Sequence, residues 1–143
     1  MSSRCVAAVL VIALLGAGCG GEKTTEEDRV RDVLAQLQTA VAAGDYRRLC
    51  TRILSRALVT RVRSVGLPCE RALAVGLGTV KRPTVKVTRV RLRGERLALA
   101  EVRTGAQGQA PATDTFRLVK ENGTWRVDSL SGAQPPAPER QGP

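Results

Sequence analysis

This 143-residue sequence contains four cysteines, whose thiols are its most reactive side chains, and no histidine. The cysteines stand at positions 5, 19, 50 and 69. Histidine is the commonest general base and the commonest metal ligand, so a histidine-based catalytic triad is excluded and the usual metal ligand is missing. Phosphate-binding glycine loops, nucleophile elbows and zinc-ligand spacings are also missing from the sequence, so no cofactor or metal is predicted.

Cys19 closes a segment with the features of an export signal. Residues 1–18 hold one charge, Arg4, followed by an apolar run that is too short to span a bilayer comfortably. The residues just before the cysteine resemble a lipobox, although Gly16 stands where the usual pattern has a large aliphatic side chain. We predict a signal peptide over 1–18, lipid attachment at Cys19, a tether over 19–24 and a location on the extracytoplasmic face of the cell membrane. An ordinary signal peptide with an incidental Cys19 is the alternative.

Cys50 and Cys69 remain as an even pair in a domain predicted to be exported. Oxidising surroundings favour a disulfide between them. The loop that this bond closes has about 20 residues, for which loop-entropy models give roughly 3 kcal/mol of stabilisation. A redox or metal pair is the alternative, but the spacing is not C-x-x-C and no other ligand type clusters nearby.

Helical periodicity dominates the first half of the chain. Thr24 and Glu27 have the spacing of a capping box, and apolar residues from Val30 to Val41 then follow one helical face. Gly44 is expected to end this helix. A second helix is expected from Tyr46 to Val62.

A short third helix is expected after Pro68, and it carries Cys69. From Thr84 the apolar period changes to two, which indicates strands. The residues at 93–96 and the Asn122-Gly123 pair are typical of hairpin turns, and the parity of the apolar residues changes near Thr88, which indicates a bulge. The expected strands cover residues 84–92, 97–102, 115–119 and 125–130, with a loop over 104–112.

The order of these elements, helices first and antiparallel strands second, predicts an α+β fold with N-terminal helices packed on a curved antiparallel sheet of about four strands. The domain is expected to cover residues 25–131. Residues 132–143 are rich in proline, glycine and glutamine and are predicted to be a disordered tail. Aromatic residues make up 2% of the chain, so the core must consist of aliphatic side chains.

These elements together resemble the nuclear transport factor 2-like superfamily over residues 25–131. The resemblance rests on the long first helix, Gly44-Asp45-Tyr46, the two cysteine-bearing helices and the closing hairpin from Glu121 to Val127. It implies a sheet wrapped around the first helix as a cone that holds a pocket. Members of the superfamily include isomerases, dehydratases, binding domains and dimerisation modules, so a homodimer through the sheet is one expectation.

The aromatic residues Tyr46, Phe116 and Trp125 are the candidates for lining that pocket. For Tyr46 and Trp125, a contact in the core explains the residue more simply. Asp114 and Asp128 lie on or beside strands, and Asp128 is expected to face away from Trp125, because neighbours on a strand point to opposite faces. No pair of carboxylates has the placement that acid–base catalysis requires.

Three functions are consistent with these observations. The first is a lipid-anchored, non-catalytic binding or structural module, whose partner is a small apolar ligand or an envelope protein. The second is an isomerase- or dehydratase-like enzyme that uses an inward Asp with Tyr46. The third is electrostatic association with anionic membrane or wall polymers, which the net charge of +10 favours. Nucleic acid is not an expected partner, because the chain is predicted to be exported and has no row of aromatic side chains for base stacking.

Overall fold

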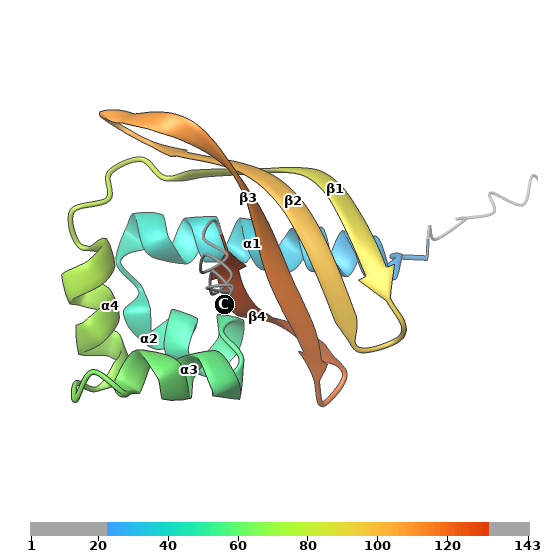
Figure 1. Ribbon diagram of the computed structural model, residues 1–143, viewed down its shortest axis with the longest axis horizontal. Helices are drawn as coiled ribbons and strands as arrows, with labels where there is room; N and C mark the ends of the chain where they lie inside the picture. Colours follow the sequence, from blue (N-terminus) through green and yellow to red (C-terminus); the bar gives the residue numbers. More distant parts are fainter. Residues whose placement is uncertain (1–22, 132–143) are drawn as a thin grey trace, which may run out of the picture.

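The computed structural model describes residues 23–131, which form an α+β fold (Figure 1). The predicted signal peptide, the lipid-attachment residue Cys19 and the tail over 132–143 lie outside the described residues, so those predictions stay predictions. The helical elements are α1 (Glu26–Ala43), α2 (Tyr46–Arg48), the π-helix η1 (Leu49–Ile53), α3 (Arg56–Arg63) and α4 (Cys69–Leu77). The strands are β1 (Thr84–Arg93), β2 (Leu97–Ala106), β3 (Gln109–Glu121) and β4 (Thr124–Ser131).

The four strands form one antiparallel sheet in the order β1-β2-β3-β4, which confirms the predicted fold class. The pairing of β1 with β2 shifts between Val87 and Arg89, as the sequence predicted, and that of β3 with β4 shifts between Arg117 and Leu118. Such shifts bend the strands. The sheet therefore curves around α1, while α2, α3 and α4 gather at the C-terminal end of α1 (Figure 1).

The predicted first helix is confirmed, but its N-cap is one residue later than expected. Thr25, rather than Thr24, accepts a hydrogen bond from the backbone N–H of Asp28, whose carboxylate in turn accepts from the Thr25 backbone. The hydroxyl of Thr25, and then its backbone N–H, donate to the carboxylate of Asp28 and lower its pKa. At the other end, Gly44 adopts a left-handed conformation with φ of 65°, which glycine adopts without steric cost.

A core of aliphatic side chains joins α1 to the concave face of the sheet. One stripe of α1 packs on short side chains of β2 and on longer ones of β3 and β4, because alternate residues of each strand point inward. The most deeply buried members are Val30, Leu34, Leu49, Ile53, Ala98, Ala100, Val102, Leu118 and Val127. None of the helices among residues 23–131 is long and apolar enough to cross a membrane.

The second predicted helix is wrong as a continuous element, because it breaks at Leu54 and Ser55. Leu54 is extended and pairs with Val127 as an isolated parallel bridge, and the N–H of Ser55 donates to the carbonyl of Val127 at 2.8 Å. Ser55 then caps α3 by accepting from the N–H of Leu58. This short extended piece covers the free edge of β4, which would otherwise expose unpaired backbone groups.

The loop predicted over 104–112 is also wrong, because both flanking strands continue through it. β2 extends to Ala106 and β3 begins at Gln109, so the connection is a tight turn at Gln107 and Gly108. Pro111 is tolerated in β3 because β4 pairs only with the other half of β3, from Thr115 onward, so one edge of the strand is open there. The extended hairpin forms one wall of an apolar cavity.

Candidate functional site: an apolar cavity

A cavity of about 290 Å³ lies between the helical end of the molecule and the concave face of the sheet. Four helical elements (α1, η1, α3 and α4), the α4–β1 loop and all four strands contribute to its wall. No charged side chain among residues 23–131 lines it. The residues that line it are Leu37, Gln38, Val41, Leu49, Leu54, Leu58, Val62, Leu73, Leu77, Val80, Pro83, Thr84, Val85, Thr104, Gly105, Ala106, Gln109, Ala110, Ala112, Phe116 and Leu130.

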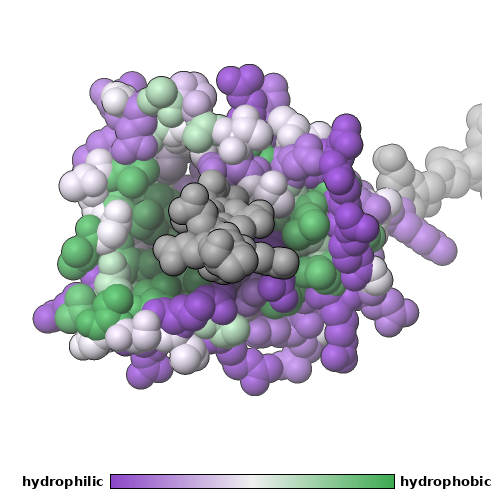
Figure 2. All heavy atoms as spheres, viewed as in Figure 1, coloured by the Kyte–Doolittle hydropathy of each residue, from purple (hydrophilic) through white to green (hydrophobic). Residues whose placement is uncertain are grey.

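The cavity opens to solvent on the side shown in Figure 2, where apolar side chains border a hollow between the helices and the sheet. Leu130 near the end of β4 is 52% exposed although it pairs with the buried Phe116. Ala110 and Ala112 are exposed on β3. A large apolar side chain exposed at the mouth of an apolar cavity is typical of a ligand-binding site.

Small side chains explain why the space is not filled. The concave face carries alanine at positions 98, 100, 106 and 112, and the chain has one phenylalanine to span the gap. Protein interiors normally pack with few voids larger than a water molecule. The shortage of large side chains, combined with the curvature of the sheet, therefore leaves a cavity that no side chain fills.

Two polar side chains in the wall have fixed orientations. The Oε1 atom of Gln38 accepts a hydrogen bond from the backbone N–H of Val85 at 2.7 Å, which leaves its amide N–H₂ group as the free donor. The hydroxyl of Thr104 donates to Oδ2 of Asp114 at 2.6 Å. Val85, the partner of Gln38, pairs with Thr104 across β1 and β2. The two polar side chains therefore lie at the same end of the cavity.

The disulfide between Cys50 and Cys69 is present, as predicted. It joins η1 to the first residue of α4, across a Cα–Cα distance of 6.1 Å. α4 supplies Leu73 and Leu77 to the cavity wall. The bond therefore holds one wall of the cavity against the rest of the domain.

Of the three aromatic residues predicted to line a pocket, Phe116 lies in this wall and the other two lie elsewhere. The ring of Tyr46 packs beside Gly44 and Gly78, where the ends of α1 and α4 meet. Trp125 is buried at the opposite end of α1, close to the start of that helix. The core contacts that the sequence favoured for these two residues match these positions.

A polar cluster holds Trp125 at the start of α1. Its indole N–H donates to Oε2 of Glu26 at 2.8 Å, and Nζ of Lys120 lies 2.7 Å from the same oxygen and 5.4 Å from the indole centroid. The hydrogen bond from Lys120, and then that from Trp125, lower the pKa of Glu26. The charged carboxylate is therefore favoured in the folded state.

Replacing Glu26 by Gln is expected to make stability less dependent on pH under acidic conditions. A lowered pKa in the folded state means that the carboxylate stabilises the fold fully above its unfolded value of about 4.3, and that this contribution is lost as the pH falls through the lowered pKa. Thermal unfolding of both proteins from pH 7 to pH 3 checks this. The wild-type midpoint should exceed that of Glu26→Gln by a constant amount above pH 5 and converge with it below pH 4. Parallel curves throughout would contradict the assignment.

The two candidate aspartates take different positions. Asp114 lies on the concave face, beside its hydrogen-bond partner Thr104, whereas Tyr46 packs at the junction of α1 and α4. Asp128 is the extra residue at the register shift between β3 and β4, and it is 6% exposed. Its Oδ1 atom accepts from the hydroxyl of Ser55 at 2.6 Å.

Two arginines complete the surroundings of Asp128. Arg61 and Arg117 each lie 3.7 Å from one of its carboxylate oxygens, and Arg61 also donates to its backbone carbonyl. These contacts link α3 to the β3–β4 bulge. The arrangement is that of a structural ion cluster, because each carboxylate oxygen is already engaged.

No protein-family model matches the sequence, and no curated protein matches it either. Among the solved structures with a similar fold is a phospholipid-binding protein from Ralstonia solanacearum, in complex with a phospholipid. The two sequences are 19% identical, and the alignment covers 73% of each chain with a TM-score of 0.41. A similarity this distant does not indicate a shared function, and the function has to be inferred from the cavity itself.

Proposed function

We propose that this protein is a non-catalytic binding module that holds a small apolar ligand, or the hydrocarbon part of an amphiphile, in the cavity between α3, α4 and the sheet. The observation that carries the proposal is an open cavity with an uncharged and mainly aliphatic wall. Pockets of this kind bury most of a ligand, and a few polar groups in the wall fix its orientation. Here Gln38 and Thr104 are those groups.

The volume limits the size of the ligand. An engineered cavity of about 150 Å³ lined by apolar side chains stays dry and binds benzene, and one water occupies about 30 Å³ in the liquid. A cavity of about 290 Å³ therefore holds roughly ten non-hydrogen atoms. A ten-carbon chain fits this limit, and longer molecules would extend through the mouth beside Leu130.

Calorimetric titration with decan-1-ol and with decanoic acid tests the proposal. Burial of each methylene contributes about 0.8 kcal/mol, so ten of them give at most about 8 kcal/mol before ordering costs, which corresponds to a dissociation constant of about 1 μM. We expect binding in the micromolar range with a negative heat-capacity change, the signature of apolar burial. Absence of binding by both compounds, at ligand concentrations high enough to saturate a site of micromolar affinity, would reject the proposal.

Substitution of Ala112 by Phe is expected to weaken the binding of decan-1-ol at least tenfold. Ala112 is exposed at the mouth and lies in register with Thr104, so an added ring occupies the space that the ligand needs. The matched control is Thr113→Phe, because Thr113 is the next residue and points to the outer face of the sheet. The control should bind within twofold of the wild type, and thermal unfolding should show that both variants fold. Equal binding by Ala112→Phe and Thr113→Phe would place the ligand elsewhere.

The lipid anchor at Cys19 and the extracytoplasmic location complete the proposal. They rest on the sequence of residues 1–19, and they are supported by the Cys50–Cys69 disulfide, because such bonds persist in oxidising compartments. Radiolabelled fatty acid supplied to the native host should enter the wild-type protein and not a Cys19→Ser variant. Retention of residues 1–18 without label in the wild type would overturn the anchor and leave the ligand proposal intact.

A further inference from the structure

α4 has an apolar inner side and an outer side that mixes apolar and charged residues. Leu73 and Leu77, one turn apart, face the cavity, whereas Arg71 and Val75 lie one turn apart on the opposite side. Val75 is 74% exposed. The outer side therefore presents Val75 to solvent beside the charged residues Glu70 and Arg71, a mixture of apolar and charged groups that suits a lipid interface.

The turn that precedes α4 extends the same surface. Three large apolar side chains are exposed among residues 23–131. Two of them are Val75 and Val65, and Val65 lies in this turn with 68% of its surface exposed. The third, Leu130, belongs to the cavity mouth. Figure 2 shows apolar side chains gathered over this end of the molecule and continuing into the hollow.

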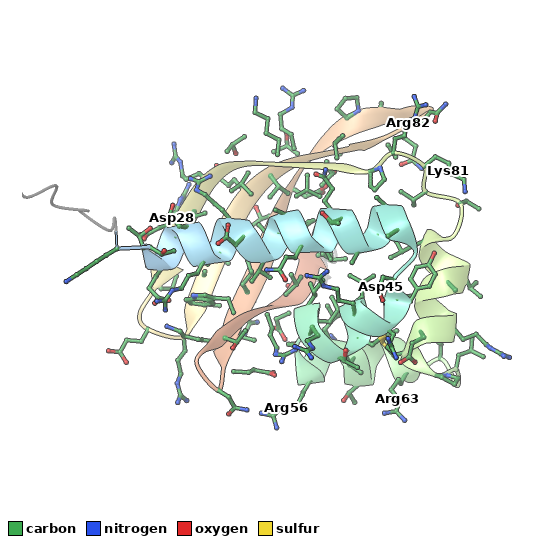
Figure 3. The ribbon with its side chains drawn as sticks, turned by 180° about the vertical axis from the view of Figure 1, so that it is seen from behind. Asp28, Asp45, Arg56, Arg63, Lys81 and Arg82 are labelled. Carbon is green, nitrogen blue, oxygen red and sulfur yellow. A yellow bond between two sulfur atoms is a disulfide. The ribbon has the colours of Figure 1, made fainter. Side chains whose placement is uncertain are left out.

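Unpaired cations flank the apolar side chains. Arg63, Arg71, Lys81 and Arg82 make no ion pair or side-chain hydrogen bond within the described part of the chain, and Glu70 is the one acidic residue from position 63 to 82. In Figure 3, Arg63, Lys81 and Arg82 lie at the α4 end of the molecule, and their side chains point outward. By contrast, Arg61, near the end of α3, is paired with Asp128.

We infer that the outer side of α4, with the α3–α4 turn and the α4–β1 loop, docks on an anionic lipid bilayer. Valine side chains enter the interface between headgroups and acyl chains, and the four cations contact lipid phosphates. A second copy of this chain is a poorer partner, because a symmetric contact would bring two sets of unpaired cations together. A soluble anionic polymer would pair with the cations and leave the valines in water.

Docking in this orientation places the cavity beside the bilayer, because the inner side of α4 is one of its walls. The inference extends the proposed function and does not require it, since binding to vesicles can be measured without any cavity ligand. Failure of decan-1-ol binding and failure of vesicle binding are therefore separate results.

Vesicle co-sedimentation tests the docking surface. The protein used begins at residue 19 and carries Cys19→Ser, so that it keeps all residues from 23 to 131 and no attached lipid. We expect binding to vesicles of equal parts phosphatidylglycerol and phosphatidylcholine, much weaker binding to pure phosphatidylcholine, and a decrease as salt is raised from about 0.02 to about 0.15 M. Equal binding to both vesicle types would overturn the inference.

Two pairs of neutralising substitutions separate a docking surface from general attraction by the net charge. Each basic residue near an anionic surface contributes about fivefold to binding. The variant Arg71→Gln/Lys81→Gln should therefore bind about 30-fold more weakly than the unsubstituted protein. The control Arg93→Gln/Arg96→Gln removes two exposed cations at the β1–β2 turn, at the other end of the molecule (Figure 1), and should change binding less than twofold. Equal losses in the two variants would contradict the inference.

An environment-sensitive fluorophore distinguishes insertion from surface attraction. Attached to Val75→Cys, the label should shift to shorter wavelength on anionic vesicles and be quenched by brominated acyl chains. Attached to Thr113→Cys on the outer face of the sheet, it should show neither change. An unshifted label at position 75 while the protein is bound to vesicles would overturn the docking orientation. If the protein instead dimerises as its concentration rises, and the label at position 75 is buried in the dimer without lipid, the partner is a second copy of the chain and not a bilayer.

Discussion

Removal of the Cys50–Cys69 disulfide is expected to lower the free energy of unfolding by about 3 kcal/mol. The bond joins residues 19 apart in sequence, and its loss restores the conformational freedom of that loop in the unfolded chain. For a domain of this size the unfolding midpoint should fall by roughly 10–20 °C. Urea and thermal unfolding of Cys50→Ala/Cys69→Ala, followed by the fluorescence of Trp125, measures the change in protein that begins at residue 19 and carries Cys19→Ser.

Chemical reduction supplies the control for that comparison. The unsubstituted protein, once reduced, should unfold at the midpoint of the double variant, because both then lack the same bond. Thiol titration of the denatured but unreduced protein should find no free thiol. Two free thiols, or equal midpoints for all three samples, would contradict the assignment of a stabilising bridge.

The loss of the disulfide should also weaken the binding of decan-1-ol. α4 contributes Leu73 and Leu77 to the cavity and packs on α2, η1 and α3, with the disulfide as its covalent attachment. A wall that opens more often reduces the fraction of molecules with a formed cavity, and the apparent affinity falls by that fraction. Stability and ligand binding are therefore coupled through one helix.

The sequence predicted the elements whose signals are local. α1 has a capping box, one apolar stripe and a terminal glycine, and each hairpin turn that was predicted has its own turn residues. The N-cap of α1 was misplaced by one residue because both Thr24 and Thr25 have an acidic residue three positions later. The bulge at Thr88 was visible because it reverses the alternation of apolar residues along β1.

Features that depend on distant partners were not predictable in this way. The apolar period continues across Leu54, and the one local mark of the break between η1 and α3 is Ser55, a residue type that is common at helix N-caps. The break is stabilised by Val127 and Asp128, which lie 73 residues further along the chain. The same reason applies to the hairpin at Gln107 and Gly108, where glycine, alanine and proline suggest a loop and pairing with β2 makes a strand.

The sequence predicted that a pocket exists but identified only one of the residues that line it. The family resemblance implied a cone with a pocket, and Phe116 lies in its wall. The lining side chains are mainly aliphatic and come from nine segments of the chain, so no motif identifies them. One signal was available: alanines at positions 106, 110 and 112 read as inward-facing strand residues once 104–112 is taken as a hairpin. Aromatic side chains were poor guides because Tyr46 and Trp125 pack at helix ends instead.

Substitution of Asp128 by Ala is expected to destabilise the domain by about 2 kcal/mol. The carboxylate is buried and binds Ser55, Arg61 and Arg117, and removal of one member of a buried charged cluster leaves its partners without compensation. The larger losses known for fully buried pairs do not apply, because both arginines are about half exposed and water screens them. Urea unfolding monitored by Trp125 fluorescence measures the loss.

Asp128→Asn separates the hydrogen bond from the charge. An amide oxygen still accepts from the hydroxyl of Ser55, which caps α3, but it no longer attracts the two guanidinium groups. We expect the Asn variant to recover about half of the stability lost in the Ala variant. The control Asp32→Ala, on the exposed side of α1, should cost less than about 0.5 kcal/mol. If Asp128→Ala were as stable as this control, Asp128 would not be the group that holds α3 against the sheet, and α3 would have to be positioned by its cavity-lining residues Leu58 and Val62 alone.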